Sequence, residues 1–284
     1  MAASPSHTAA TPTEMWGASS LARIGALFRT TRLGGVVLVL ALLCLWEASA
    51  RFGLIQSVNW PPFSAVLVAL FRGLADGELV SVIGSTLWRM ARGYAIGCAI
   101  GVPLGIAVAL SRPVRWTLEP TIELLRPIPV PAIIPPLIFV FGINDPLKLF
   151  AVAFAVLFPV ALNTMSGVAS VDPIYVQVAR TFGVSRVRTL YRVVFPASLP
   201  FVLAGLRTSL ALALVVAVVA EMIAGDSGVG YYLITMQFAV RSADMYAAII
   251  LLAAVAYALN WVFIAWEARV IGWARTREAA GKQP

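Results

Sequence analysis

The chain has 284 residues, of which 60% are hydrophobic and only 12% are charged, and its formal net charge is +8. This balance excludes an ordinary soluble domain, and the recurrence of apolar runs of about 18 residues excludes a soluble domain with a single anchor. We therefore expect an all-α, polytopic membrane protein. Membrane proteins gather cations in their cytoplasmic loops, so the positive charge does not indicate nucleic-acid binding. Both cysteines fall in apolar runs, which argues against a disulfide framework or a metal cluster.

In the N-terminal stretch 1–32, residues 1–20 are small and polar, with interspersed prolines. No apolar core followed by a small-residue cleavage site occurs in the first 30 residues or so, and we expect a disordered cytoplasmic tail rather than a signal peptide. The transmembrane domain is expected over residues 33–268. The basic stretch 269–284 is expected to form a second cytoplasmic tail.

Six apolar segments are candidate spans: residues 33–50, 88–110, 128–142, 147–168, 201–224 and 246–266. With the N-terminus in the cytoplasm, most lysines and arginines fall on the cytoplasmic side, Arg126 among them. The positive-inside rule therefore favours a protein with both termini in the cytoplasm.

Two features accompany the first two spans. After the sequence NWPP, apolar residues recur at helical spacing and predict a short amphipathic helix on the outer surface within residues 59–78. The second span carries glycines at every fourth position, on one helical stripe that lets another helix approach closely: Gly93, Gly97, Gly101 and Gly105. This stripe is expected to be a packing face inside the chain, with a dimer interface as the alternative.

The third span is rich in proline. Its first half, which includes Pro129 and Pro131 and reaches Pro135, is not expected to be a regular helix. Irregular backbone inside a membrane must be buried in protein or line a water-filled path. A kinked element beside a translocation pathway fits this rule, and a shallow re-entrant segment is the alternative.

The polar segment between the fourth and fifth spans, about residues 170–200, carries four arginines. Its apolar positions and Gly183 predict two short helical pieces joined at a glycine turn. Pro196 and Pro200 are expected to end this loop before the fifth span. Two amphipathic pieces at a membrane surface could bind lipid headgroups or a protein partner, and the pattern alone leaves both open.

The same segment resembles the EAA signature of ABC importer permeases: Glu-Ala-Ala, three residues, Gly, nine residues, Ile-x-Leu-Pro. Every spacing is kept in the matching residues, which are Gln177, Val178, Ala179, Gly183, Val193, Val194, Phe195 and Pro196. Gln177 replaces the glutamate, so no role that requires a carboxylate there carries over. The resemblance implies that this segment is a coupling loop that docks in a groove of a cytoplasmic ATPase subunit. A bulky or charged residue at Gly183 is then expected to uncouple transport.

The likeness extends over Thr86 to Tyr232, and its motifs resemble the nitrate, sulfonate and taurine class of these permeases. It implies a permease dimer, here expected to be a homodimer, in a bacterial inner membrane among its lipids. It also implies two ATPase subunits, which use ATP and Mg, and an extracytoplasmic solute-binding protein. The chain itself is expected to bind no cofactor and no metal.

Polar residues inside the spans are the candidates for the translocation pathway: Asn163, Thr164, Ser209 and Glu221. Serine and threonine often bond a helix carbonyl instead, which weakens each of these two as a candidate. Glu221 lies near the outer end of the fifth span and could line the pathway or pair with a cation such as Arg241. Because a bare carboxylate repels an anionic solute, we favour a structural or gating role for it.

Other function classes fit the sequence less well. There is no Walker A motif or HExxH pair, and the only histidine is His7, so the chain is not expected to be an enzyme. An ion-coupled secondary transporter is the main alternative, although it would be expected to carry carboxylates at mid-membrane and often an inverted repeat. A membrane scaffold without transport activity is a third option.

Overall fold

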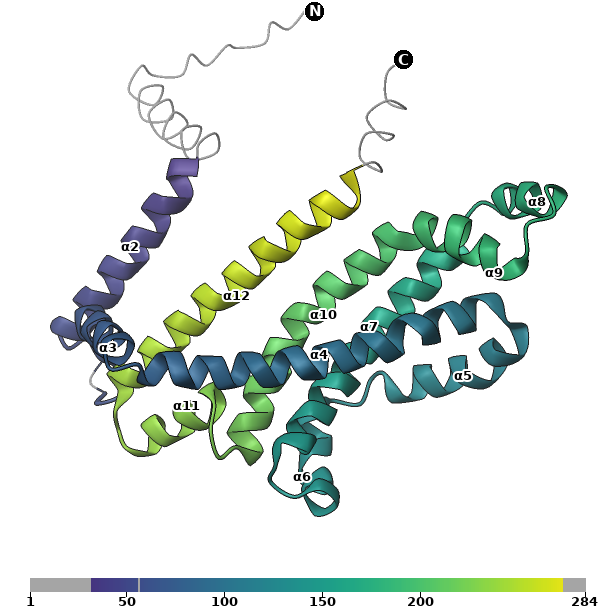
Figure 1. The fold of residues 1–284 in the computed structure, drawn as a ribbon. Coiled ribbons are helices and arrows are strands. Elements are labelled where there is room, and N and C mark those ends of the chain that lie inside the picture. The colour runs from purple at the N-terminus through teal and green to yellow at the C-terminus, as the bar shows by residue number, and fades with distance from the viewer. Residues whose placement is uncertain (1–31, 56, 273–284) are drawn as a thin grey trace, which may run out of the picture. The chain divides into compact units, whose positions relative to one another are not determined.

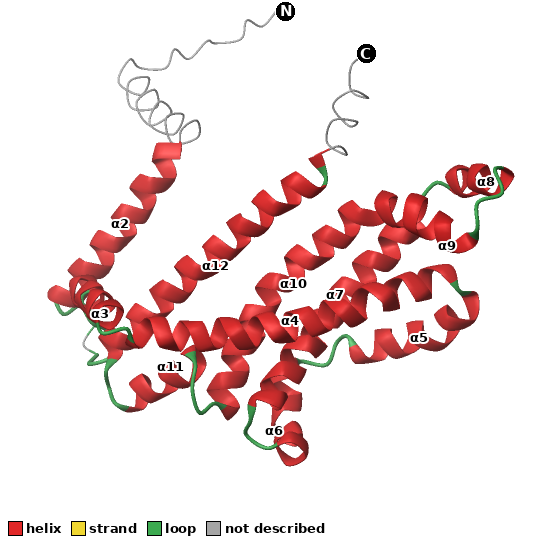
Figure 2. Cartoon of the chain, in the orientation of Figure 1, coloured by secondary structure: helices red, strands yellow, loops and turns green. Residues whose placement is uncertain are grey.

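The computed structural model describes residues 32–55 and 57–272, and every regular element in these ranges is helical (Figure 2). The first predicted tail, apart from Arg32, lies outside the described residues, as do residues 273–284 of the second. The last helix, α12 (Ser242–Val270), extends slightly into the second predicted tail. Packing divides the described residues into two units, and the boundary falls between Val66 and Leu67.

The first unit contains α2 (Arg32–Arg51), an apolar helix long enough to cross a membrane. Near its end the Trp46 ring lies 5.5 Å from the ring of Trp60, between centroids. This aromatic contact holds the end of α2 against the segment that leads into α3 (Phe63–Ala75). α3 is the short helix predicted within residues 59–78.

The second unit is built around three long helices, α4 (Glu78–Leu110), α7 (Asp145–Ala169) and α10 (Phe195–Ala224), which lie side by side (Figure 1). The glycine stripe of α4 faces α7, where the nearest side chains follow in the same order: Gly93 on Val152, Gly97 on Val156, Gly101 on Val160 and Gly105 on Thr164. Because both sets of numbers rise together, α4 and α7 run in the same direction. The stripe is thus a packing face inside the chain.

α10 runs in the opposite direction along α7. Gly205 of α10 packs on Asn163, whereas Gly167, further along α7, packs on Phe201, earlier in α10. Side chains of all three helices then share one hydrophobic core, which includes Met90, Val156 and Ala217. α4 itself starts well before the predicted Trp88, at Glu78, directly after a left-handed glycine at position 77.

The prediction that Pro196 and Pro200 end the loop before the fifth span is wrong, because α10 begins at Phe195 and includes both prolines. A wide π-helical turn, Leu190–Val194, precedes it, and there the N–H of Phe195 bonds to the carbonyl of Leu190. Pro196 has no N–H and its ring would clash with a carbonyl of the preceding turn in a regular helix. The wider turn relieves that clash and lets the helix continue.

The proline-rich span consists of α5 (Arg112–Leu125) and α6 (Val130–Phe141), which meet at a 99° bend. The prediction of an irregular first half is wrong from Val130 onward, since α6 contains Pro135 and Pro136 within regular helix. Each of these prolines removes a backbone hydrogen bond without ending the helix, and the irregular backbone is confined to the bend.

The directions of α4 and α7 decide how this bent pair sits in the membrane. Both helices are long and apolar enough to span, and both run the same way. The chain between them must therefore return to the side from which α4 started. α5 and α6 together form this return as a broken span, which raises the count in the described residues from five candidate spans to six. A re-entrant segment would return the chain to the membrane side where α4 ends. From that side, α7 would have to cross the membrane in the direction opposite to α4.

After α10, the short helix α11 (Val229–Phe238) packs between α10, α4 and α12. Its Tyr232 and Met236 form a small apolar cluster with Leu79 and Ala248. α12 then runs back as the last candidate span of the described residues. The start of α4, the start of α7 and the end of α10 all lie at the α11 end of this unit (Figure 1).

Candidate functional site

The loop between α7 and α10 has the two helical pieces that the sequence predicts. α8 (Pro173–Thr181) is capped by Asp172, whose carboxylate accepts a hydrogen bond from the N–H of Ile174 at 2.8 Å. Gly183 follows with φ +69°, in the left-handed region where glycine is favoured. The chain then reverses into α9 (Arg186–Thr189). The glycine turn thus fixes the angle between the two pieces.

The surface of this loop combines apolar and cationic side chains. Phe182 at its tip is 80% exposed. Other exposed members of the surface are apolar or aromatic residues (Ile174, Tyr175, Val178, Val187, Tyr191), Gln177 and four arginines (Arg180, Arg186, Arg188, Arg192). A groove of about 450 Å³ runs between α8 and the π-helical turn, with buried Ala179 and half-buried Val193 in its lining. We call these residues the coupling surface.

A contiguous exposed surface of this kind is unusual unless something covers it. The aromatic and arginine side chains at its centre are the residue types enriched in protein interfaces. Phe195 and Pro196 are half-buried at the start of α10 and connect the coupling surface rigidly to that helix.

At the opposite end of the unit, Glu221 of α10 is buried, with 1% of its side chain exposed, and accepts three hydrogen bonds. Its donors are the Thr86 hydroxyl at 2.8 Å, the Arg89 guanidinium at 3.1 Å and the N–H of Gly230 at 3.1 Å. Of the two possibilities that the sequence left open for Glu221, it pairs with a cation, but that cation is Arg89 and not the suggested Arg241, which bonds to Asp244 at the start of α12. Glu221 instead joins α10 to α4 and to the start of α11.

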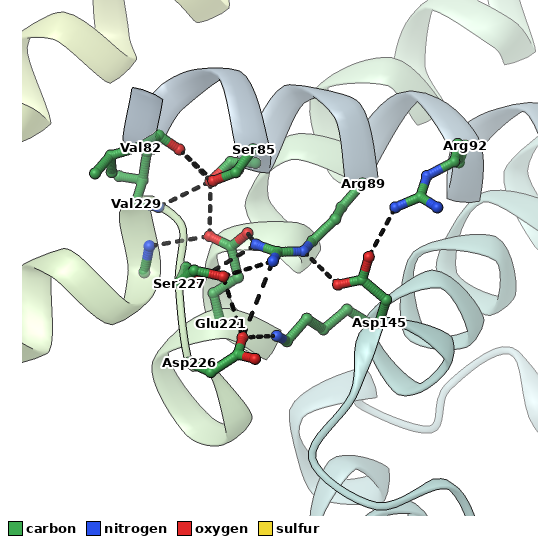
Figure 3. A network of polar contacts seen from close by, with 12 residues as sticks. Val82, Ser85, Arg89, Arg92, Asp145, Glu221, Asp226, Ser227 and Val229 are labelled. Carbon is green, nitrogen blue, oxygen red and sulfur yellow. Dashed lines mark hydrogen bonds and ion pairs between the residues drawn. The ribbon is translucent and has the colours of Figure 1, made fainter. Parts of the chain in front are cut away.

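Arg89 is the centre of a wider charge network. Figure 3 shows its guanidinium between the carboxylates of Glu221 and Asp145, and the Arg89 Nε bonds to Asp145 at 2.7 Å. Lys148, 1% exposed, donates to Asp226 at 2.6 Å. This hydrogen bond lowers the pKa of Asp226 to about 2. The network ties the ends of α4, α7 and α10 to the segment before α11.

Sequence reasoning missed the partners of Glu221. Arg89, Asp145 and Lys148 were visible as charges close to the ends of apolar spans, which is a signal that such side chains have partners. Their pairing was not visible, because Arg89 and Glu221 are 132 positions apart in the chain.

A cavity lies where α5 meets α6. Its volume is about 690 Å³, and α7 supplies most of the opposite wall, including Phe158 and Asn163. Of the four predicted pathway residues, Asn163 lines this cavity. Thr164 and Ser209 are buried away from it, and the Ser209 hydroxyl bonds to the carbonyl of Leu206. Whether any of them contacts a solute stays a prediction.

Comparisons with known proteins agree on the type of chain. Residues 101–272 match the family model described as binding-protein-dependent transport system inner membrane component. The chain is 33% identical to the putative aliphatic sulfonates transport permease protein SsuC of Escherichia coli over 86% of this chain and 88% of that protein. It is 32% identical to the E. coli taurine transport system permease protein TauC, over 82% and 86%.

A bicarbonate transport system permease protein, CmpB of Synechococcus elongatus, is 32% identical over 71% of this chain and 73% of its own length. Among solved structures, the MetNI methionine ABC transporter in inward-facing conformations aligns with a TM-score of 0.60 and 17% identity, covering 68% of this chain and 95% of that one. At this identity the structural likeness concerns the fold alone.

Proposed function

The chain belongs to the family of binding-protein-dependent transport system inner membrane components, and from this premise we propose that it is the permease subunit of an ATP-driven importer of a small anion, such as an aliphatic sulfonate, taurine or nitrate. The support for an anion comes from the relatives, which are named for aliphatic sulfonates, taurine and bicarbonate. A sulfonate and bicarbonate share a compact negative head group, and taurine carries such a sulfonate group as well.

The coupling surface supports the proposed ATPase partner. The EAA-like residues Gln177 and Ala179 belong to it, Gly183 adjoins it, and the groove beside them is lined mainly by apolar side chains. In the proposed complex, this loop sits in a groove of a cytoplasmic ATPase subunit that binds ATP and Mg, while the permease chain binds neither. With the loop in the cytoplasm, the helix directions bring the end of α12 to the cytoplasmic side too.

The fold offers a route for the movement. The loop joins α7 directly to α10, and these two helices pack along their lengths. The charge network around Arg89 holds their far ends together with α4. When ATP closes two ATPase subunits, loops seated in them would tilt these three helices as one body, in each copy of a permease homodimer.

The test is uptake by the complete complex. The chain is reconstituted with its ATPase and binding protein, and uptake of radiolabelled ethanesulfonate, taurine, nitrate and bicarbonate is measured separately. We expect uptake of at least one anion that requires ATP and the binding protein. Uptake driven by a proton or sodium gradient without ATP would instead support the ion-coupled alternative and overturn the proposal.

A further inference from the structure

The cavity at the bend between α5 and α6 contains one charged side chain, Arg126. Arg126 is the C-cap residue of α5 and precedes Pro127, where the helix stops. The remaining wall is formed by apolar residues, prolines and two polar side chains, Asn163 and Ser166 of α7. No acidic residue contributes to the lining.

The position of Arg126 along the membrane normal follows from the packing of α5. Starting next to the end of α4, α5 folds back along α4 and α7, and Ile122 packs in one cluster with Val108 and Phe158. Its 14 residues rise about 21 Å, out of a hydrocarbon core of about 30 Å. Arg126 therefore lies near the level of Phe154 and Phe158, the middle of α7, and not in the cytoplasmic group to which the charge pattern assigned it.

An arginine at this depth needs a partner, because a lone charge in the membrane interior costs several kcal/mol. In the described part of the chain its guanidinium makes no hydrogen bond or ion pair, and the side chain is exposed to the cavity. By contrast, Arg89, Arg92 and Lys148 in the same membrane unit are all paired with carboxylates. Arg126 has no such partner among the described residues, and at its depth in the membrane it calls for an external counter-ion.

The other lining groups suit an anion with a small organic part. The Asn163 amide uses one N–H on the Pro159 carbonyl at 2.8 Å, which leaves its second N–H available, and Ser166 presents a hydroxyl. Phe154 and Phe158 supply apolar walls. The C-terminal dipole of α5 and the N-terminal dipole of α6 meet at the bend and largely offset one another, so the net charge of the cavity is that of Arg126.

We propose that Arg126 recognises the anionic head group of the solute during its passage, with Asn163 and Ser166 as neutral hydrogen-bond donors. This inference rests on the proposed function, since it names the site at which a transported anion is bound within the permease. The cavity, at about 690 Å³, is of the size of common small-molecule sites and accommodates a small sulfonate together with water.

The first experiment measures transport. In the reconstituted complex, Arg126→Gln and Arg126→Lys are compared with Arg112→Gln, a control that removes an exposed cation from the start of the same helix. We expect Arg126→Gln to lower kcat/KM for ethanesulfonate uptake roughly tenfold or more, the size of one lost charge-assisted contact. Arg126→Lys should retain much of the wild-type kcat/KM, and ATP hydrolysis should persist in both Arg126 variants. Arg112→Gln should transport like the wild type. Unchanged uptake in Arg126→Gln, or equal loss of assembly in both variants, overturns the proposal.

A second measurement does not depend on transport. Asn163→Cys is introduced into a chain carrying Cys44→Ser and Cys98→Ser, and its thiol is modified with an anionic or a cationic methanethiosulfonate reagent. A nearby arginine should favour the anionic reagent by a factor on the order of ten, and Arg126→Gln should abolish that preference. The thiol could prefer the anionic reagent although ethanesulfonate, taurine, nitrate and bicarbonate are not transported. In that case the anion site is supported and the proposed class of solute is wrong. If the preference does not depend on Arg126, the site fails whatever is transported.

Discussion

Replacing Glu221 by glutamine tests the charge network most sharply, because the two side chains have the same shape. One carboxylate oxygen accepts from Arg89, and the other accepts from Thr86 and Gly230. The NH₂ group of the glutamine must point either toward Arg89 or toward Thr86 and Gly230. All three of these residues donate hydrogen bonds to Glu221. At least one buried donor then loses its acceptor.

The size of the effect follows from which groups remain paired. Leaving a buried donor unsatisfied costs about 1–3 kcal/mol, and breaking a buried ion pair costs about 3–5 kcal/mol. Arg89 keeps Asp145 as a partner, so we expect a loss of about 2–3 kcal/mol in the free energy of unfolding. For a chain of 284 residues that lowers Tm by roughly 3–5 °C.

The assay is the midpoint of thermal unfolding of the purified protein in detergent, at one heating rate for all variants because unfolding of such proteins is often irreversible. Asp244→Asn is the matched control, since its partner Arg241 is exposed and such a pair contributes about 0–1 kcal/mol. A shift for Glu221→Gln no larger than that of the control would refute the account of the network.

Two further variants test packing and charge. Gly97→Leu should lower Tm by several degrees or prevent folding, because a Cβ there would lie 2.8 Å from the Cβ of Val156, while Gly84→Ala on the same helix, where space is open, should leave Tm nearly unchanged. Equal effects of the two would contradict the close packing of α4 on α7. The stabilisation by the Lys148–Asp226 pair should be lost only in acid: because the folded pKa of Asp226, about 2, lies below its usual value near 3.8, the stabilisation is present above about pH 4 and is lost as the pH falls towards 2. In a Tm series between pH 5 and 2.5, Asp226→Asn should remove that part of the acid sensitivity, and an unchanged profile would contradict the pairing.

Local patterns in the sequence predicted much of this fold. Apolar runs located the long helices, and Gly183 marked the turn between α8 and α9. The same local reasoning failed at prolines that the helix accommodates without ending. Pro135 lies within α6, and the π-helical turn before α10 accommodates Pro196, because a helix packed against neighbours survives the loss of a few hydrogen bonds.

The candidate sites were harder to predict, because they depend on contacts between distant segments. Glu221 was singled out, but its partner Arg89 comes from α4, far away in the sequence. Arg126 was assigned to the cytoplasm because it falls between the predicted spans 88–110 and 128–142, in a loop that the positive-inside rule places there. Only the packing of Ile122 against Phe158 shows that this helix returns into the membrane unit and carries the arginine with it.

The central claim is that the loop around Gly183 holds an ATPase subunit. The direct test is to purify the tagged chain from its native membrane in mild detergent and to quantify the ATPase that accompanies it. Gly183→Val is compared with Gly183→Asn, because asparagine tolerates the left-handed backbone at φ +69° and a β-branched residue does not. We expect an equimolar ATPase with wild type and Gly183→Asn, and much less with Gly183→Val, although that chain stays intact. Absence of an ATPase from intact wild-type protein, or equal amounts with all three chains, would contradict it.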